Sequence, residues 1–146
     1  MSTTLGSDLL SVVARINRLA NQRLRMPVPF AQARLLSTIE DRGEARISDL
    51  AALDHCSQPT MTTQVRRLED AGLVARAADP NDARAVLIRI TPDGVAALRQ
   101  ARADRGAAVA PYLERLSAAD RACLEQAVGI MRRIIEDATT QSPSPR

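Results

Sequence analysis

The segment from Ser57 to Arg89 is rich in hydroxyl, amide and guanidinium side chains, which are the groups that hydrogen-bond to nucleic acid. Gln pairs with adenine, Thr contacts the thymine methyl group, and Arg binds guanine or phosphate through two N–H groups. The first half of the segment holds these candidates for DNA contact: Ser57, Gln58, Thr60, Thr62, Thr63, Arg66 and Arg67. Two more candidates, Asp82 and Arg84, lie in the second half. These side chains can act together only if the surrounding elements bring them to one surface.

The spacing of apolar residues predicts a short amphipathic helix in the first half of the segment. Ser57 can cap its start, and Pro59 is tolerated in its first turn. Met61, Val65 and Leu68 follow at helical spacing and form one apolar stripe. A glycine after LEDA is a typical stop signal. The helix therefore turns its polar side chains away from the core.

A rotation of about 100° per residue places Arg66 opposite this stripe and Arg67 at its flank. Because a recognition helix offers its N-terminal part to base edges, the Gln and Thr residues are candidates for base or phosphate contacts. Arg66 is a candidate for guanine or phosphate, and Arg67 for phosphate. Alternatively, the two Arg side chains form a solvated face that Glu69 and Asp70 balance.

A β-hairpin is predicted after this helix. Two apolar runs, 73–78 and 85–90, flank the turn sequence DPND. Arg84 near its tip is the candidate to enter the minor groove, whose negative potential attracts Arg. The alternative is an ion pair between Asp82 and Arg84 that only shapes the turn, and both roles are compatible. The strands carry two weaker candidates for DNA contact, Arg76 and Arg89.

A helix followed by a hairpin with a basic tip is typical of a winged helix-turn-helix, which reads DNA. Before this segment, the pattern predicts a first helix over about 5–25, a second over 30–42, a short strand at 46–47 and a third helix over 48–54 capped by Ser48. The helix that follows Ser57 is the fourth. After the hairpin, a fifth helix is predicted to start at Thr91–Gly94 and to kink or end at Pro111, and a last helix to start at Ser117–Asp120. Residues 1–4 are expected to fray and residues 139–146 to form a disordered tail. The fold class is therefore mainly α (α+β).

The apolar stripes of the first and last helices are too broad for the small winged lobe to cover. They comprise Leu5, Leu9, Val12, Ile16 and Leu19 on the first helix, and Leu124, Val128, Met131 and Ile135 on the last. Packing against a second copy covers both stripes. We therefore expect a homodimer of single-domain chains, with about 5–25 and 95–138 as dimerisation helices and about 30–94 as the DNA-binding lobe.

The composition gives weak evidence for nucleic acid. All 20 basic residues are Arg, the net charge is +3, and six Arg balance six acidic residues between Arg46 and Arg89. A positive patch must therefore come from where the charges sit. The chain has two cysteines, no signal-peptide pattern and no long apolar run, so we expect a cytoplasmic, reduced protein.

No pattern of residues suggests an enzyme, a cofactor or a metal site. The sequence lacks a nucleophile–base pair or a Gly-rich phosphate loop, and the single histidine, His55, lacks metal-binding companions. His55 is expected to be exposed or to satisfy a turn. Cys56 is a weak candidate for oxidant sensing, and Cys123 is expected in the core.

Three segments resemble the MarR-type (multiple antibiotic resistance regulator) transcription factors. They are LEDAGLVAR at 68–76, DPNDAR at 79–84 and ITPDG at 90–94, and the resemblance extends over about residues 5–136. It implies a homodimeric winged-helix repressor or activator that binds a pseudo-palindrome. It also implies release of DNA when a small aromatic or other lipophilic ligand binds between the dimerisation and DNA-binding parts.

The sequence leaves open whether a small ligand regulates the protein and whether the protein binds specific DNA. The sequence offers Arg15 and Arg18 on the first helix as weak candidates for a carboxylate ligand, and plain surface charges are the alternative. The leading hypothesis is a ligand-responsive repressor, and a DNA-binding dimer without small-molecule input is a further alternative that the sequence leaves open. The competing function is a winged-helix dimerisation scaffold without specific DNA binding, which the neutral central charge permits.

Overall fold

The computed structural model describes residues 2–22 and 29–141. In this part of the chain, helices and strands follow in the order α1 (Ser2–Gln22), α2 (Phe30–Arg42), β1 (Glu44–Arg46), α3 (Ile47–Leu53), α4 (Gln58–Asp70), β2 (Val74–Asp79), β3 (Asp82–Ile90), α5 (Pro92–Leu113) and α6 (Ala118–Gln141). The chain forms two compact units, one that ends at Ala108 and one that begins at Val109. The order of elements from α2 to the start of α5 is that of a winged helix-turn-helix, as predicted.

Helix α4 begins and ends where its capping residues predict. Ser57 has an extended backbone, and its Oγ accepts a hydrogen bond from the Thr60 amide at 3.3 Å. Gly72, just past the end of α4, has a φ of 74°, which glycine adopts without strain. Between these ends, Met61 and Val65 are almost completely buried. The predicted apolar stripe of α4 is therefore confirmed.

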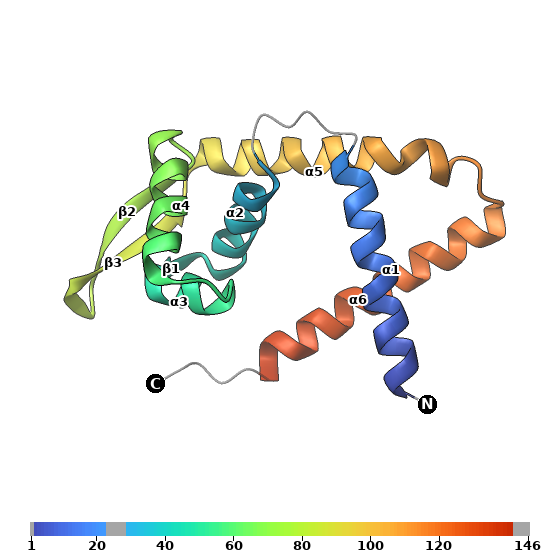
Figure 1. Cartoon of the computed structure of the whole chain (residues 1–146), viewed down its shortest axis with the longest axis horizontal. Coiled ribbons are helices and arrows are strands. Elements are labelled where there is room, and N and C mark those ends of the chain that lie inside the picture. Colours follow the sequence, from blue (N-terminus) through green and yellow to red (C-terminus); the bar gives the residue numbers. More distant parts are fainter. Residues whose placement is uncertain (1, 23–28, 142–146) are drawn as a thin grey trace. The chain divides into compact units, whose positions relative to one another are not determined.

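The hairpin forms two strands of a three-stranded antiparallel sheet with the order β1–β3–β2. Strand β1 pairs with β3 only from Arg89 to Leu87, so the part of the hairpin beyond Leu87 lacks a third strand. Figure 1 shows this part of β2 and β3 extending past the neighbouring helices. The wing is therefore a two-stranded ribbon whose orientation depends on contacts at its base.

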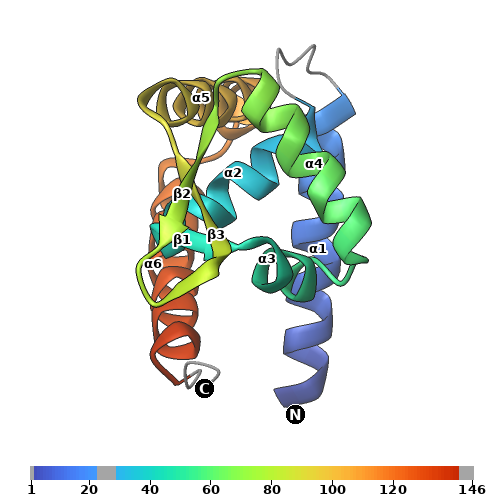
Figure 2. The same cartoon turned by 90° about the vertical axis from the view of Figure 1, so that its left-hand side faces the viewer.

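A single hydrophobic core joins α2, α3, α4 and the sheet, which lie together in Figure 2. The largest fully buried side chains in it are Leu36, Ile39, Leu50, Met61, Leu68, Ile88 and Val65. The first half of α5 joins this core through Leu98 and Ala101. The core thus fixes α4 and the base of the wing relative to each other.

The junction between the wing and α5 depends on a glycine. The Thr91 Oγ1 accepts a hydrogen bond from the Gly94 amide at 3.0 Å and donates one to the Gly72 carbonyl at 2.7 Å. A Cβ atom at position 94 would overlap the backbone carbonyl of Leu73. Only glycine therefore allows α5 to start so close to the chain that leaves α4.

Replacing Gly94 by Ala is expected to destabilise the protein by about 1–3 kcal/mol, because the backbone must move to relieve the overlap. Gly106→Ala in the same helix is the matched control, since a Cβ there meets no atom within 4 Å. The control should be neutral or stabilise by about 0.5–1 kcal/mol. Chemical denaturation of both variants measures the difference, and equal stability of the two would contradict this view of the junction.

Helices α1 and α6 leave their apolar stripes largely exposed in the single chain. Among the most exposed are Leu5 at 73% and Leu10 at 70% on α1, and Ile134 at 55% and Ile135 at 65% on α6. Exposure of so many large aliphatic side chains is typical of an interaction surface. These stripes are therefore available to a partner.

Several boundaries differ from the prediction at the N-terminal side. Helix α1 includes residues 2–4, which we expected to fray, and its predicted end at 23–25 lies outside the described residues. Helix α3 begins at Ile47 rather than after Ser48, and the N-cap residue is Arg46 without a side-chain cap. The strand lies earlier than predicted, at Glu44–Arg46, because its pairing with β3 ends at Arg46, and Ile47 instead packs against the core from the first turn of α3.

Other differences concern the C-terminal half. Strand β3 already begins at Asp82, and α5 continues through Pro111 to Leu113. Helix α6 reaches Gln141, so the start of the predicted disordered tail is helical, while 142–146 lie outside the described residues. Thr139 and Thr140 are satisfied there because their hydroxyl groups donate to carbonyls of the preceding turn.

The expectations for the cysteines and the histidine have mixed outcomes. Cys123 is exposed, so its prediction as a core residue is wrong; it lies on α6 beside a stripe that this single chain leaves uncovered. Cys56 is half-buried against the core. His55 is exposed and has a φ of 50°, which makes the turn between α3 and α4.

Membrane-spanning helices and metal-binding clusters are both absent from the residues that the structure describes. None of their helices combines the length and apolar character needed to span a membrane. They also contain no group of three or more His, Cys, Asp or Glu side chains that could hold a metal ion.

Candidate nucleic-acid interface

The outward face of α4 presents most of the predicted DNA contacts together. Gln58, Thr60, Thr63, Arg66 and Arg67 are exposed, and Thr62 is half-buried. The buried stripe on the opposite side fixes this orientation. The structure therefore places these candidates on one surface, as the sequence predicted.

The hydroxyl groups on this face are partly committed to the helix itself. Thr62 Oγ1 donates to the Gln58 carbonyl at 2.9 Å, and Thr63 Oγ1 donates to the Pro59 carbonyl at 3.1 Å. Ser57 and Thr60 hydrogen-bond to each other through their hydroxyl groups. In this arrangement the Thr methyl groups, rather than hydroxyl donors, are free for contact with a thymine methyl group.

Arg66, Arg67 and Arg84 make no ion pair with any described residue. Glu69, which we considered as a partner of the first two, instead binds Arg76 at 2.9 Å. The guanidinium groups of these three residues therefore stay available for an external anion. The weaker candidates are engaged: Arg76 with Glu69, and Arg89 with Glu44.

The wing turn holds Arg84 through its backbone. Asp82 Oδ1 accepts a hydrogen bond from the Arg84 amide at 3.0 Å. This contact closes the turn without engaging the Arg84 side chain, which is exposed. Asp82 thus shapes the turn, while the guanidinium group of Arg84 remains free.

The sequence analysis missed an ion pair at the base of the wing. Arg46 donates to Asp79 Oδ2 from Nε at 3.0 Å and from Nη2 at 2.5 Å, and Asp79 is only 7% exposed. The hydrogen bond from the Asn81 amide and the bonds from Arg46 hold the pKa of Asp79 below its usual value, and Asp79 raises the pKa of Arg46. The DPND sequence contains both acids, but it does not show which one is buried.

A basic groove separates the start of α4 from the wing. Its lining includes Ser48, Gln58, Arg46, Arg76 and Arg84. Three Arg residues line this groove, and two of them, Arg46 and Arg76, bind carboxylates. Among these three, only Arg84 has no ion-pair partner in the described residues, so the free positive charge of this region comes from Arg84 together with Arg66 and Arg67 on α4.

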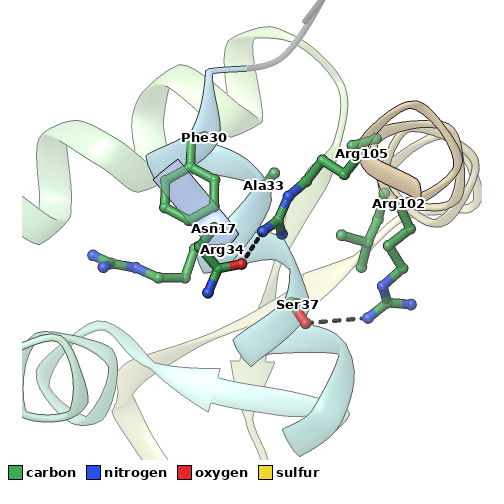
Figure 3. Close-up of a pocket in the computed structure, with 9 residues that line it drawn as sticks. Asn17, Phe30, Ala33, Arg34, Ser37, Arg102 and Arg105 are labelled. Carbon is green, nitrogen blue, oxygen red and sulfur yellow. Dashed lines mark hydrogen bonds between the residues drawn. The ribbon is translucent and has the colours of Figure 1, made fainter. Parts of the chain in front are cut away.

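A second cavity, of about 180 Å³, is lined by residues of α1, α2 and α5. Figure 3 shows Arg102 and Arg105 extending from α5 toward α2, with hydrogen bonds to Ser37 and Asn17. The Arg105 guanidinium group also lies 5.0 Å from the centre of the Phe30 ring. Its Nε is buried without a hydrogen-bond partner among the described residues. The cavity is thus lined by the guanidinium group of Arg105, which pairs with no carboxylate of the described residues.

The two sequence candidates for a carboxylate ligand do not line this cavity. Arg15 and Arg18 are exposed on α1, and the residue of α1 that reaches the cavity is Asn17. Sequence reasoning missed Arg102 and Arg105 because they lie in an Ala- and Arg-rich helix whose facing direction has no clear apolar pattern. Only the packing of α5 against α2 distinguishes them from surface charges.

Comparisons with known proteins agree with this fold. Residues 30–86 match the sequence model of the MarR family. An HTH-type transcriptional regulator of Mycobacterium bovis is 30% identical over 92% of this chain and 94% of its own length. Among solved structures, wild-type MarR from E. coli has a TM-score of 0.69 at 26% identity, covering 87% of this chain and 96% of its own.

A variant of E. coli MarR in complex with operator DNA has a TM-score of 0.59 at 25% identity, covering 88% of this chain and 93% of its own. The winged lobe, its wing and the helices that flank it are thus shared with these proteins along almost the whole chain. This protein belongs to the MarR family.

Proposed function

We propose that this protein is a homodimeric transcription regulator that binds a pseudo-palindromic DNA operator, most simply as a repressor. The observation that carries the proposal is the free cationic surface: Arg66 on the outward face of α4 and Arg84 on the wing have no ion-pair partner among the described residues. The complex of a MarR variant with operator DNA supports it. In this function the outward face of α4 and the wing contact the same DNA duplex.

Each surface has its own role in this proposal. Helix α4 enters the major groove with Gln58, Thr60, Thr62 and Thr63 toward base edges, while Arg84 enters the minor groove beside it. Two copies related by a two-fold axis read half-sites about one helical turn, ~34 Å, apart. The operator therefore has the same two-fold symmetry as the dimer.

Selection of bound sequences from a random DNA pool tests this function. We expect enrichment of one inverted repeat with half-sites about ten base pairs apart. Retention of all sequences alike would indicate non-specific binding, and no retention would favour a dimerisation scaffold. Expression of a reporter behind the selected site, with and without the protein, distinguishes a repressor from an activator.

The cavity between α1, α2 and α5 supports a ligand-responsive regulator. A volume of about 180 Å³ lies below the roughly 300–1,000 Å³ of sites for drug-sized molecules, so it suits a small ligand. The Arg105 guanidinium group and the Phe30 ring both line the cavity, and Arg105 makes no ion pair with a described residue. A small aromatic carboxylate matches both features. Its binding reduces DNA affinity only if it favours a spacing of the α4 helices that does not fit the operator.

Titration of salicylate into the DNA complex, followed by fluorescence anisotropy, tests this cavity. We expect release at millimolar salicylate, and Arg105→Met should raise the required concentration by on the order of tenfold through loss of a charged hydrogen bond. Arg15→Ala and Arg18→Ala are the controls, since these residues lie outside the cavity. Release that Arg105→Met leaves unchanged would refute the assignment of Arg105, and no release from any variant would indicate a regulator without this input.

A further inference from the structure

Asp79 stands out because it is the single buried charged or polar side chain among the described residues. It ends β2, directly before the wing turn, at a point where the pairing with β3 is irregular. Its carboxylate accepts from the Asn81 amide on one oxygen and from two nitrogens of Arg46 on the other. A buried carboxylate with this many donors is held in one position.

Arg46 reaches this carboxylate from the opposite edge of the sheet. It lies on β1, whereas Asp79 lies on β2, and β3 separates the two strands. The Arg46 side chain therefore crosses one face of β3, and the half-buried Ala85 lines the same groove. Because β1 pairs with β3 no further than Leu87, this ion pair ties the projecting ribbon to the third strand beyond the last backbone pairing.

The same guanidinium group also lies near the residue that shapes the tip. Arg46 Nη1 is 4.0 Å from Asp82 Oδ2, and Asp82 Oδ1 holds the backbone amide of Arg84. At its other end, Arg46 is the N-cap residue of α3, which packs against α4. A continuous series of contacts thus runs from the helix-turn-helix, through Arg46 and the two carboxylates, to Arg84.

We propose that Arg46 is a positioning residue for DNA binding: through Asp79 and Asp82 it sets the orientation of the wing relative to α4, so that Arg84 meets the minor groove while α4 occupies the major groove. The inference rests on the proposed DNA-binding function. It predicts that Arg46 acts through Arg84 and not as a phosphate contact of its own, since its guanidinium group is already committed to carboxylates. A two-stranded ribbon without this tie samples several orientations, which weakens simultaneous docking.

A double-mutant cycle between Arg46→Met and Arg84→Ala tests the coupling. Operator binding is measured by fluorescence anisotropy for the full-length wild type, both single variants and the double variant. We expect Arg46→Met to weaken binding by on the order of tenfold in the wild type and by less than about twofold in the Arg84→Ala background. An equal loss in both backgrounds would overturn the proposal, because it would show that Arg46 acts independently of Arg84.

Asp79→Ala separates a positioning role from a simple charge effect, because the two predict opposite changes in DNA affinity. Removal of an acidic residue close to DNA strengthens binding if only charge matters. Loss of the tie weakens binding instead, and we expect a several-fold loss that Arg84→Ala again masks. Tighter binding by Asp79→Ala would contradict the positioning role.

Arg89→Met is the matched control, since Arg89 also joins an ion pair across β1 and β3, with Glu44 at the end of the sheet away from the wing turn. It removes the same charge, and its effect should be smaller than that of Arg46→Met and additive with Arg84→Ala. Circular dichroism and thermal melts confirm that each variant is folded. A wild type that does not bind DNA defeats the proposed function itself, whereas a binding wild type with an additive cycle defeats only this inference.

Discussion

Replacing Val128 by Glu is expected to convert the proposed homodimer into a monomer and to abolish binding to the proposed operator. Val128 lies in the centre of the apolar stripe of α6 and is 43% exposed in the single chain. If this stripe packs against a second copy, the two-fold axis introduces two carboxylates into one interface. Burying an unpaired charge costs about 3–5 kcal/mol, so dimer affinity should fall by on the order of a hundredfold or more.

Gln126→Glu is the control for the added charge, because position 126 lies on the opposite side of α6 from Val128. Sedimentation velocity at micromolar concentration should show a dimer for the wild type and for Gln126→Glu, and a monomer for Val128→Glu. Operator affinity should follow the same order, since one half-site alone offers half the contacts. A wild type that sediments as a monomer would remove the basis for palindromic recognition.

The second large effect is expected from Arg66→Ala and Arg84→Ala, which should weaken DNA binding by different routes. Loss of a base contact by Arg66 costs about 1–3 kcal/mol per half-site and relaxes the preference at one operator position. Loss of Arg84 should weaken binding to all sequences that share the local minor-groove shape, with the greatest sensitivity to A·T content at the site edges. Fluorescence anisotropy with a set of operator variants separates these two patterns.

Salt dependence checks the same assignment. A dimer presents two copies of Arg66, Arg67 and Arg84; if all of them neutralised phosphates, the slope of log K against log salt would be about −5. If Arg66 and Arg84 engage bases and the minor groove, the slope should be shallower and Arg67→Ala should reduce it most. Arg99→Ala is the control, since Arg99 is exposed on α5 and does not line the groove between α4 and the wing. Unchanged affinity and slope in all three interface variants would exclude this surface as the DNA-binding site.

The sequence by itself determined the elements that are fixed by neighbours a few residues away. Ser57, Gly72 and Thr91 set the ends of α4 and the start of α5 through hydrogen bonds or backbone conformations within one helical turn, and the structure confirms them. The apolar spacing of α4 likewise determined which side faces the core and which side carries Arg66. The family resemblance rested on these same local segments, and the comparisons confirm it.

The tertiary structure alone decided the contacts between distant parts of the chain. The ion pair of Arg46 with Asp79 joins residues 33 positions apart, and the hydrogen bond of Arg105 with Asn17 joins residues 88 positions apart. Such pairs depend on strand register and on the packing of whole helices, to which no local spacing is sensitive. The same reason explains why Cys123 was misplaced: an apolar stripe shows which side of a helix avoids water, but only the assembled protein shows what covers it.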